Sequence, residues 1–154
     1  MKKATYKLLS EPFIQKCVRG YLKEKGFGKK DERNTELRAH GVDINVKHKD
    51  YGRHYLVECK GDPSEDVKFP EGWRSSAMNS AIGQIITRMH TDRKAIYGGH
   101  NYGIAFPYSF KNRVLKKIPY SVCNRLRLSI FLVNNKGKVE EYNHKKLKTI
   151  QNNK

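Results

Sequence analysis

Two acidic residues and one lysine interrupt apolar segments at spacings that suit phosphate chemistry. Glu58 and Lys60 are two positions apart in segment 55–60, so in a β-strand both side chains point to the same face. Asp43 lies between two apolar residues in an earlier segment. A turn around residues 50–52 would lay the two segments side by side, so the two carboxylates can reach one point.

Carboxylates that converge in this way are typical ligands of a hard divalent cation. Mg²⁺ prefers oxygen ligands and commonly takes one or two carboxylates together with substrate phosphate. Asp43, Glu58 and the backbone carbonyl of Cys59 are therefore candidate Mg²⁺ ligands, with Mn²⁺ as a substitute. The ion would polarise a phosphate and lower the pKa of a bound water, and Lys60 would position that water or stabilise the charge on phosphorus. The alternative is a surface ion pair, which contributes little to stability; the apolar residues around Glu58 favour the metal site.

The periodicity of apolar residues predicts the elements that hold these groups. A helix is expected over 11–25, and short strands are expected over 36–40, 42–46 and 55–60. A long loop over 61–73 follows, and its length suggests a functional role.

The second half of the chain alternates between helical and strand patterns. It predicts a helix over 75–90, a strand over 102–106, a helix that Ser109 caps and Pro119 ends, and a hairpin of strands 128–133 and 139–142. The order is α-βββ-α-β-α-ββ, which predicts one mixed α/β sheet flanked by helices. We expect a single domain over 1–143 and a frayed, basic tail over 144–154.

The segment His40-Gly41-Val42-Asp43-Ile44, followed by Tyr55-Leu56-Val57-Glu58-Cys59-Lys60-Gly61, resembles the PD-(D/E)XK, or restriction-endonuclease-like, nuclease superfamily. The Asp, the Glu and the Lys of that pattern are all matched, whereas Val42 replaces the usual proline. The resemblance implies a restriction-endonuclease-like fold over roughly residues 10–143. It also implies a Mg²⁺-dependent deoxyribonuclease that hydrolyses DNA phosphodiester bonds with an activated water.

Two further residues fit the resemblance. Members of the superfamily often carry a glutamate on the first helix that completes the metal site, and Glu11 looks like it; the alternative is an acid that only complements the helix dipole. Gln84 looks like the glutamine that several branches place after the catalytic strand, where it would assist the water or Lys60. The tyrosine usual four positions later is Arg88 here, and an exposed helical glutamine is the alternative reading.

The formal charge of +17 indicates a polyanionic partner, because so large a self-repulsion exceeds what solubility requires. DNA is the expected partner and RNA stays open. Residues that could contact the nucleic acid are Lys29, Lys30, Trp73, Arg74, Arg88, Lys111 and Arg113, although for Trp73 a packing anchor is the simpler reading. The alternatives to a nuclease are a non-catalytic nucleic-acid-binding module and a subunit of a larger assembly. At this length, sequence-specific cutting would need a homodimer or a partner.

Other classes of protein are not favoured by the sequence. No apolar run reaches the roughly 18 residues of a membrane-spanning helix, and no signal peptide follows the first lysines, so we expect a cytoplasmic protein without a membrane partner. Three scattered cysteines exclude a disulfide framework and a CxxC zinc site, and indicate reduced, mostly buried thiols.

Overall fold

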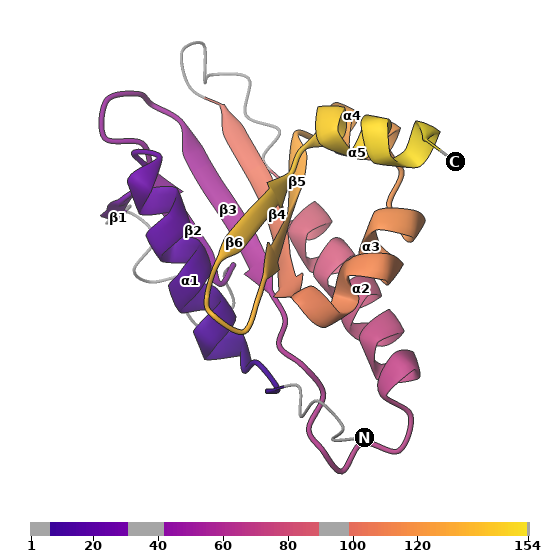
Figure 1. Cartoon of the computed structure of the whole chain (residues 1–154). Coiled ribbons are helices and arrows are strands. Elements are labelled where there is room, and N and C mark those ends of the chain that lie inside the picture. Colours follow the sequence, from indigo (N-terminus) through magenta and orange to yellow (C-terminus); the bar gives the residue numbers. More distant parts are fainter. Residues whose placement is uncertain (1–6, 31–41, 90–98, 154) are drawn as a thin grey trace.

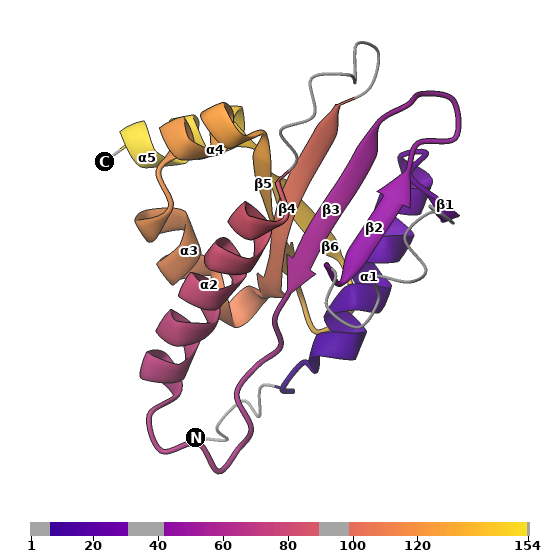
Figure 2. The ribbon, with the colours of Figure 1, turned by 180° about the vertical axis from the view of Figure 1, so that it is seen from behind.

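A mixed β-sheet with helices on both faces organises the chain (Figures 1 and 2). The structure is a computed structural model that describes residues 7–30, 42–89 and 99–153. Six strands follow one another in the sheet in chain order. They are β1 (Lys29–Lys30), β2 (Ile44–Lys47), β3 (His54–Cys59), β4 (His100–Pro107), β5 (Leu128–Val133) and β6 (Val139–Tyr142). The pairs β3–β4 and β4–β5 are parallel, and the other pairs are antiparallel.

Helix α1 (Glu11–Glu24) covers one face of the sheet, and the other helices cover the opposite face (Figures 1 and 2). These are α2 (Pro70–Thr87), α3 (Lys111–Lys117), α4 (Tyr120–Leu126) and α5 (His144–Asn152), with a short 3-10 turn, η2 (Tyr108–Phe110), before α3. The expected fold class is confirmed: the sheet is mixed and flanked by helices, consistent with a restriction-endonuclease-like α/β fold.

The alternation of side chains along β3 divides the core between the two faces. Val57 and Cys59 pack with the buried residues of α1, whereas Leu56 packs with those of α2. Because nearly all of β3 is buried, it is a central strand and not a solvated edge. The side chain of Glu58 therefore points to the α2 side of the sheet, the same side as Leu56.

Several expected elements differ from the structure. The predicted loop over 61–73 ends early, because Pro70 begins α2 and its fixed φ suits a first helical position. Ser109 does not cap α3: it lies in η2, and its hydroxyl donates to Asp62. Pro119 does end α3, but it also precedes the unpredicted α4.

The expected frayed tail over 144–154 is wrong over most of its length, because residues 144–152 form α5. The side chain of Asn143 caps this helix by accepting from Lys146 N, and Leu147 is completely buried. The predicted strand over 36–40 lies outside the described residues.

The cysteines follow the expectation of free thiols. Cys59 and Cys123 are buried on opposite faces of the sheet, and Cys17 of α1 is half-buried. Among the described helices, none combines the length and apolar character that a membrane span requires.

Candidate metal and phosphate site

Asp43 and Glu58 face each other across the β2–β3 pair. The last paired residues are Ile44 and Val57, and the same register places Asp43 opposite Glu58 one step further on. Ile44 and Val57 both point towards α1, so alternation turns the carboxylates of Asp43 and Glu58 to the α2 side. Asp43 is held there because its Oδ2 accepts a hydrogen bond of 2.7 Å from the backbone N–H of Cys59.

The two carboxylates interact strongly because Glu58 has little access to water. The residue is 4% exposed. Burial, followed by the charge and hydrogen bond of Asp43, raises the pKa of Glu58 to about 7, while Lys60 and Arg88 act in the opposite direction. Burial and the charge of Asp43 thus outweigh the effect of the two nearby cations on Glu58.

Glu11 and Lys60 join this pair. Glu11 is half-buried at the first position of α1, and its pKa is raised by burial and by Asp43 and lowered by Lys60. Lys60 follows β3 directly and its backbone N–H donates to the carbonyl of Ala105 at 2.9 Å. The end of β3 and the start of α1 thus bring together four of the residues that the sequence predicted, at the lower end of the sheet in Figure 1.

The chain leaving β3 is fixed directly against the entry to α1. Asp62 N donates to Leu9 O at 2.7 Å, and Leu9 N donates to Asp62 Oδ2 at 2.8 Å. Gly61 makes this approach feasible, because a Cβ there would lie 2.5 Å from Glu11 N and 2.9 Å from Leu9 O. Lys60 and Glu11 are therefore placed relative to each other by backbone contacts.

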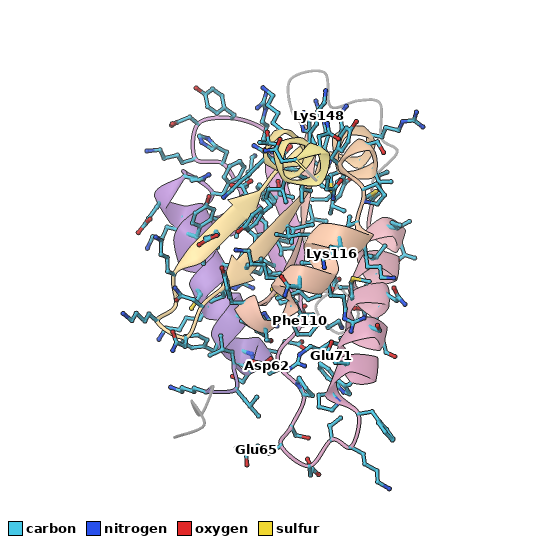
Figure 3. All side chains as sticks on the ribbon, turned by 45° about the vertical axis from the view of Figure 1, so that its right-hand side comes forward. Asp62, Glu65, Glu71, Phe110, Lys116 and Lys148 are labelled. Carbon is cyan, nitrogen blue, oxygen red and sulfur yellow. The ribbon has the colours of Figure 1, made fainter. Side chains whose placement is uncertain are left out.

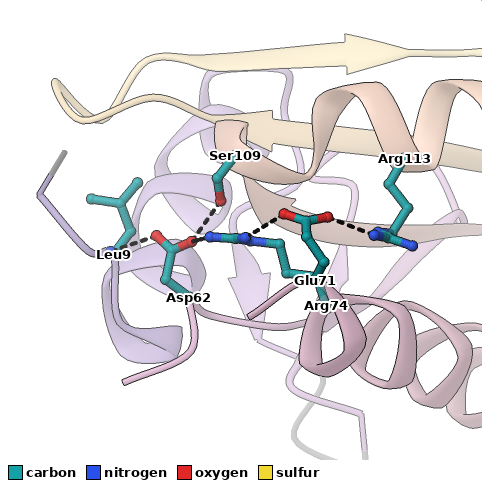
Figure 4. Close-up of polar contacts among 6 residues, drawn as sticks. All are labelled: Leu9, Asp62, Glu71, Arg74, Ser109 and Arg113. Carbon is teal, nitrogen blue, oxygen red and sulfur yellow. Dashed lines mark hydrogen bonds and ion pairs between the residues drawn. The ribbon is translucent and has the colours of Figure 1, made fainter. Parts of the chain in front are cut away.

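Asp62 also begins a polar network that reaches α2 and α3 (Figure 4). Its carboxylate, 5% exposed, accepts from Ser109 Oγ at 2.5 Å and lies 3.9 Å from Arg74. Glu71 then pairs with Arg74 at 2.7 Å and with Arg113 at 2.5 Å. Arg113 also donates to Ser75. Two of the arginines predicted to contact nucleic acid are thus engaged with carboxylates.

At the C-terminal end of α2, Arg88 and not Gln84 approaches the carboxylates. Gln84 is exposed, so the structure does not bring it to the cluster. Arg88 lies seven positions after the buried Ala81 and therefore shares its sheet-facing side. Its Nε is buried without a hydrogen-bond partner among the described residues, and its charge acts on Glu58.

The remaining predicted contact residues are dispersed. Trp73 is 37% exposed in the first turn of α2, and Lys111 donates to the Tyr108 hydroxyl at 2.6 Å. Lys29 and Lys30 form β1, at the edge of the sheet. The predicted set therefore does not form one continuous surface.

The site's donor set fits Mg²⁺, which needs only one or two carboxylates besides water and phosphate. Asp43 and Glu58 supply these, and a cation would offset the cost of ionising the buried Glu58. Within the described ranges, no three His, Cys, Asp or Glu side chains form a group that could hold a metal ion. Glu11 is near enough to feel the charge of Asp43 but does not complete such a group.

Comparison with known proteins adds little to this geometry. No protein-family model matches the chain, and no curated protein matches it. A solved structure, that of an XisH family protein from Nostoc punctiforme, is similar over 85% of this chain and 99% of its own, with a TM-score of 0.49 and 10% sequence identity. A likeness this distant supports no conclusion about activity, so the chemistry must be inferred from the site.

The structure adds two residues that the sequence did not single out. Arg19 Nη2 donates to the backbone carbonyl of Asp43 at 2.7 Å and so braces the start of β2 against α1. Asn45, two positions after Asp43, has a buried Oδ1 without a hydrogen-bond partner among the described residues. Asn45 could have been found from the period of two along the strand, because it must share the face of Asp43.

Proposed function

We propose that this protein is a metal-dependent nuclease that hydrolyses DNA phosphodiester bonds. The observation that carries the proposal is the convergence of Asp43 and Glu58, from adjacent strands, on the face from which Lys60 also emerges. DNA as the substrate follows from the family resemblance of the Asp43, Glu58 and Lys60 pattern alone, because the basic charge of the chain suits RNA equally well.

The cofactor would be Mg²⁺, with Mn²⁺ as a substitute, held by Asp43, Glu58 and the carbonyl of Cys59, with Glu11 assisting. When bound, it supplies charge neutralisation at the phosphate and acidifies water. The burial of Glu58 serves this role, because a carboxylate with little access to water gains more from a cation than an exposed one does.

The other charged side chains would act on water and phosphate directly. Lys60 would hydrogen-bond the attacking water and stabilise the negative charge that develops on the phosphoryl oxygens. Arg88, whose Nε has no hydrogen-bond partner in the part of the chain that the structure describes, would bind a phosphate oxygen on the α2 side. This role agrees with the predicted contact of Arg88 with nucleic acid, whereas Gln84 is exposed and receives no role in the site.

A plasmid-nicking assay with Mg²⁺ tests the proposal. Nicking should fall to background in Asp43→Ala and Glu58→Ala, and by about a hundredfold or more in Lys60→Ala. Glu65→Ala and Lys68→Ala, which change exposed residues of the loop before α2, are matched controls and should cut normally. Activity that persists in all three site variants would remove these residues from the mechanism.

One observation favours a second candidate, a non-catalytic nucleic-acid-binding module. It is the lack of a three-ligand metal group among the described residues. Calorimetric titration with Mg²⁺ and Mn²⁺ separates the candidates, because only the nuclease needs an affinity that depends on Asp43 and Glu58. A wild-type protein that binds DNA but neither ion would favour the module.

A further inference from the structure

A second polar site lies at the opposite end of the parallel strands. It is a cavity of about 380 Å³, within the roughly 300–1,000 Å³ range of small-molecule pockets. Its wall is formed by Tyr55, Asn101, Asn124, Arg127, Ser129, Glu141 and His144. Tyr55 lies near the start of β3, whereas Glu58 lies near its end. The pairing of Tyr55 with Asn101 turns both to the α1 side, away from the face that holds the carboxylate pair.

Three side chains of this wall, the exposed Asn124 and Arg127 and the half-buried Asn101, are open to a ligand. Asn101, Asn124 and Arg127 make no side-chain hydrogen bond or ion pair with any residue that the structure describes. The Arg127 guanidinium lies against the backbone of Gly99, where an added Cβ would be 2.5 Å from Nη1. A guanidinium with five donors and no carboxylate partner is suited to a phosphate or a carboxylate.

The backbone of Arg127 is also held in an uncommon conformation. Its φ of 53° and ψ of 43° are left-handed, and among the described residues no other non-glycine residue has a positive φ. Such a conformation costs free energy for a non-glycine residue, and it is a common way for a helix to end. Arg127 ends α4 in this way, and its side chain then lines the cavity.

The single carboxylate of the wall is already neutralised. Glu141 accepts from Lys25 Nζ at 2.8 Å, from Tyr21 Oη at 2.9 Å and from Tyr55 Oη at 3.2 Å. Lys25 thus balances Glu141, and the charge of Arg127 is left for a ligand. His144, the first residue of the nine-residue α5, adds the positive end of a helix dipole to the same wall.

We propose that this cavity binds a phosphomonoester, with Arg127, Asn101 and Asn124 holding the phosphate and Ser129 and Glu141 facing the rest of the ligand. The phosphate belongs either to a free mononucleotide or to the terminal phosphate of a nucleic-acid strand. Both offer the same dianionic group.

The test measures the binding of inorganic phosphate, a nucleoside 5′-monophosphate and the corresponding nucleoside to the full chain, by calorimetry in a chelator. The key variant is Arg127→Asn, because asparagine removes the guanidinium yet tolerates the left-handed backbone. Arg125→Asn, two positions earlier and exposed on α4, is the matched control. Phosphate and nucleotide should bind to wild type and to Arg125→Asn, and at least tenfold more weakly to Arg127→Asn.

An oligonucleotide with and without a 5′-phosphate distinguishes the two sources. A phosphorylated strand that binds more tightly than the same strand without the phosphate, with the gain lost in Arg127→Asn, assigns the site to strand ends. A mononucleotide that binds while the two strands bind equally assigns the site to free nucleotides. Equal weakening by the two arginine variants, or a nucleoside that binds as well as its monophosphate, would overturn the proposal. Asp43→Ala should leave this binding unchanged, so the result is independent of nuclease activity.

Discussion

Glu58 is a carboxylate in a setting that favours its neutral form. It is 4% exposed and lies beside the carboxylate of Asp43. An ionised group in such a position destabilises the folded chain unless a cation or a proton neutralises it. The residue that would bind the metal is thus also a source of instability in the metal-free protein, and this can be measured without any substrate.

In a chelator, Glu58→Gln should be more stable than wild type at pH 8. The folded pKa of about 7 lies above that of an unfolded glutamate, about 4.3, so ionisation penalises the folded state as the pH rises between these values. The advantage of the variant should therefore be large at pH 8 and small near pH 5. Urea unfolding across this pH range measures it, with Glu65→Gln as the exposed control; a variant less stable than wild type at pH 8 would contradict the prediction.

Glu141 should show the opposite dependence on pH. Its pKa is lowered because the hydrogen bonds and charge of Lys25 and the hydroxyl of Tyr21 outweigh burial, so its contribution to stability is present above the ordinary glutamate pKa. That contribution is lost as the pH falls through the lower folded pKa. Glu141→Gln should lower the free energy of unfolding by roughly 1–3 kcal/mol near pH 7. In urea unfolding at lower pH, the gap in this free energy between the variant and wild type should shrink. If the two proteins differ by the same free energy of unfolding down to pH 2.5, the charge of Glu141 does not contribute to stability.

At the scale of elements, the contact between the exit of β3 and the entry of α1 decides whether Glu11 faces Lys60. The backbones touch at Gly61, where the obstacles to a Cβ are main-chain atoms that cannot rotate away. A substitution there must move the start of α1.

Gly61→Ala should therefore destabilise the protein by roughly 1–3 kcal/mol and reduce nicking by about a hundredfold. Gly20→Ala is the matched control, because it lies within α1 and its added Cβ would meet no atom within 4 Å beyond the adjacent residues and backbone of its own helix. It should stabilise the helix by roughly 0.5–1 kcal/mol and leave nicking unchanged. Thermal unfolding and the nicking assay on both variants test this prediction. If the two variants have the same stability and the same nicking activity, the backbone contact at Gly61 does not position the site.

The strand pair of the candidate site could be predicted from the sequence because its signals are local. The period of two fixes the common face of Glu58 and Lys60, and the short turn between the strands fixes the register with Asp43. Arg88 was harder to place, since the resemblance pointed to Gln84, and only the packing of Ala81 and Ile85 against the sheet shows which side of α2 faces the carboxylates.

The elements that were missed depend on contacts far away in the chain. Helix α5 is strongly polar, and its one fully buried residue, Leu147, becomes informative only when the sheet and the other helices are in place. Gln151 then donates to the carbonyls of Leu115 and Ile118 and accepts from Tyr120 N, which ties α5 to the junction of α3 and α4. No pattern within 144–154 could reveal these partners.

At the scale of the whole molecule, one helical layer carries basic side chains without any acidic ones. Helices α3, α4 and α5 contain no acidic residue, and Figure 3 shows Lys116 and Lys148 on this side. The exposed basic residues of the layer are Lys116, Lys117, Arg125, Lys145, Lys146 and Lys148. If DNA is the partner, this layer is where its backbone should lie.

The salt dependence of DNA binding tests this placement, in a chelator that prevents cleavage. Each lost phosphate contact lowers the slope of log affinity against log salt by about 0.9. A variant with three changes in α3 and α5, Lys116→Gln, Lys145→Gln and Lys148→Gln, should thus lose about 2 to 3 units of slope.

A second triple variant controls for net charge. It carries Lys16→Gln, Lys49→Gln and Lys68→Gln, three exposed lysines outside the layer. Its slope should stay within about one unit of wild type. The same loss in both variants would show that the affinity follows the overall charge and not this layer.

The unequal accessibility of the three thiols gives a practical route to observing helix α1. Cys59 and Cys123 are buried, so a maleimide dye applied to the folded protein should react with Cys17 alone. The dye would sit on the helix whose first residue is Glu11. Its fluorescence could then follow, in real time, any shift of that helix as ions or oligonucleotides are added, without engineering a new attachment point.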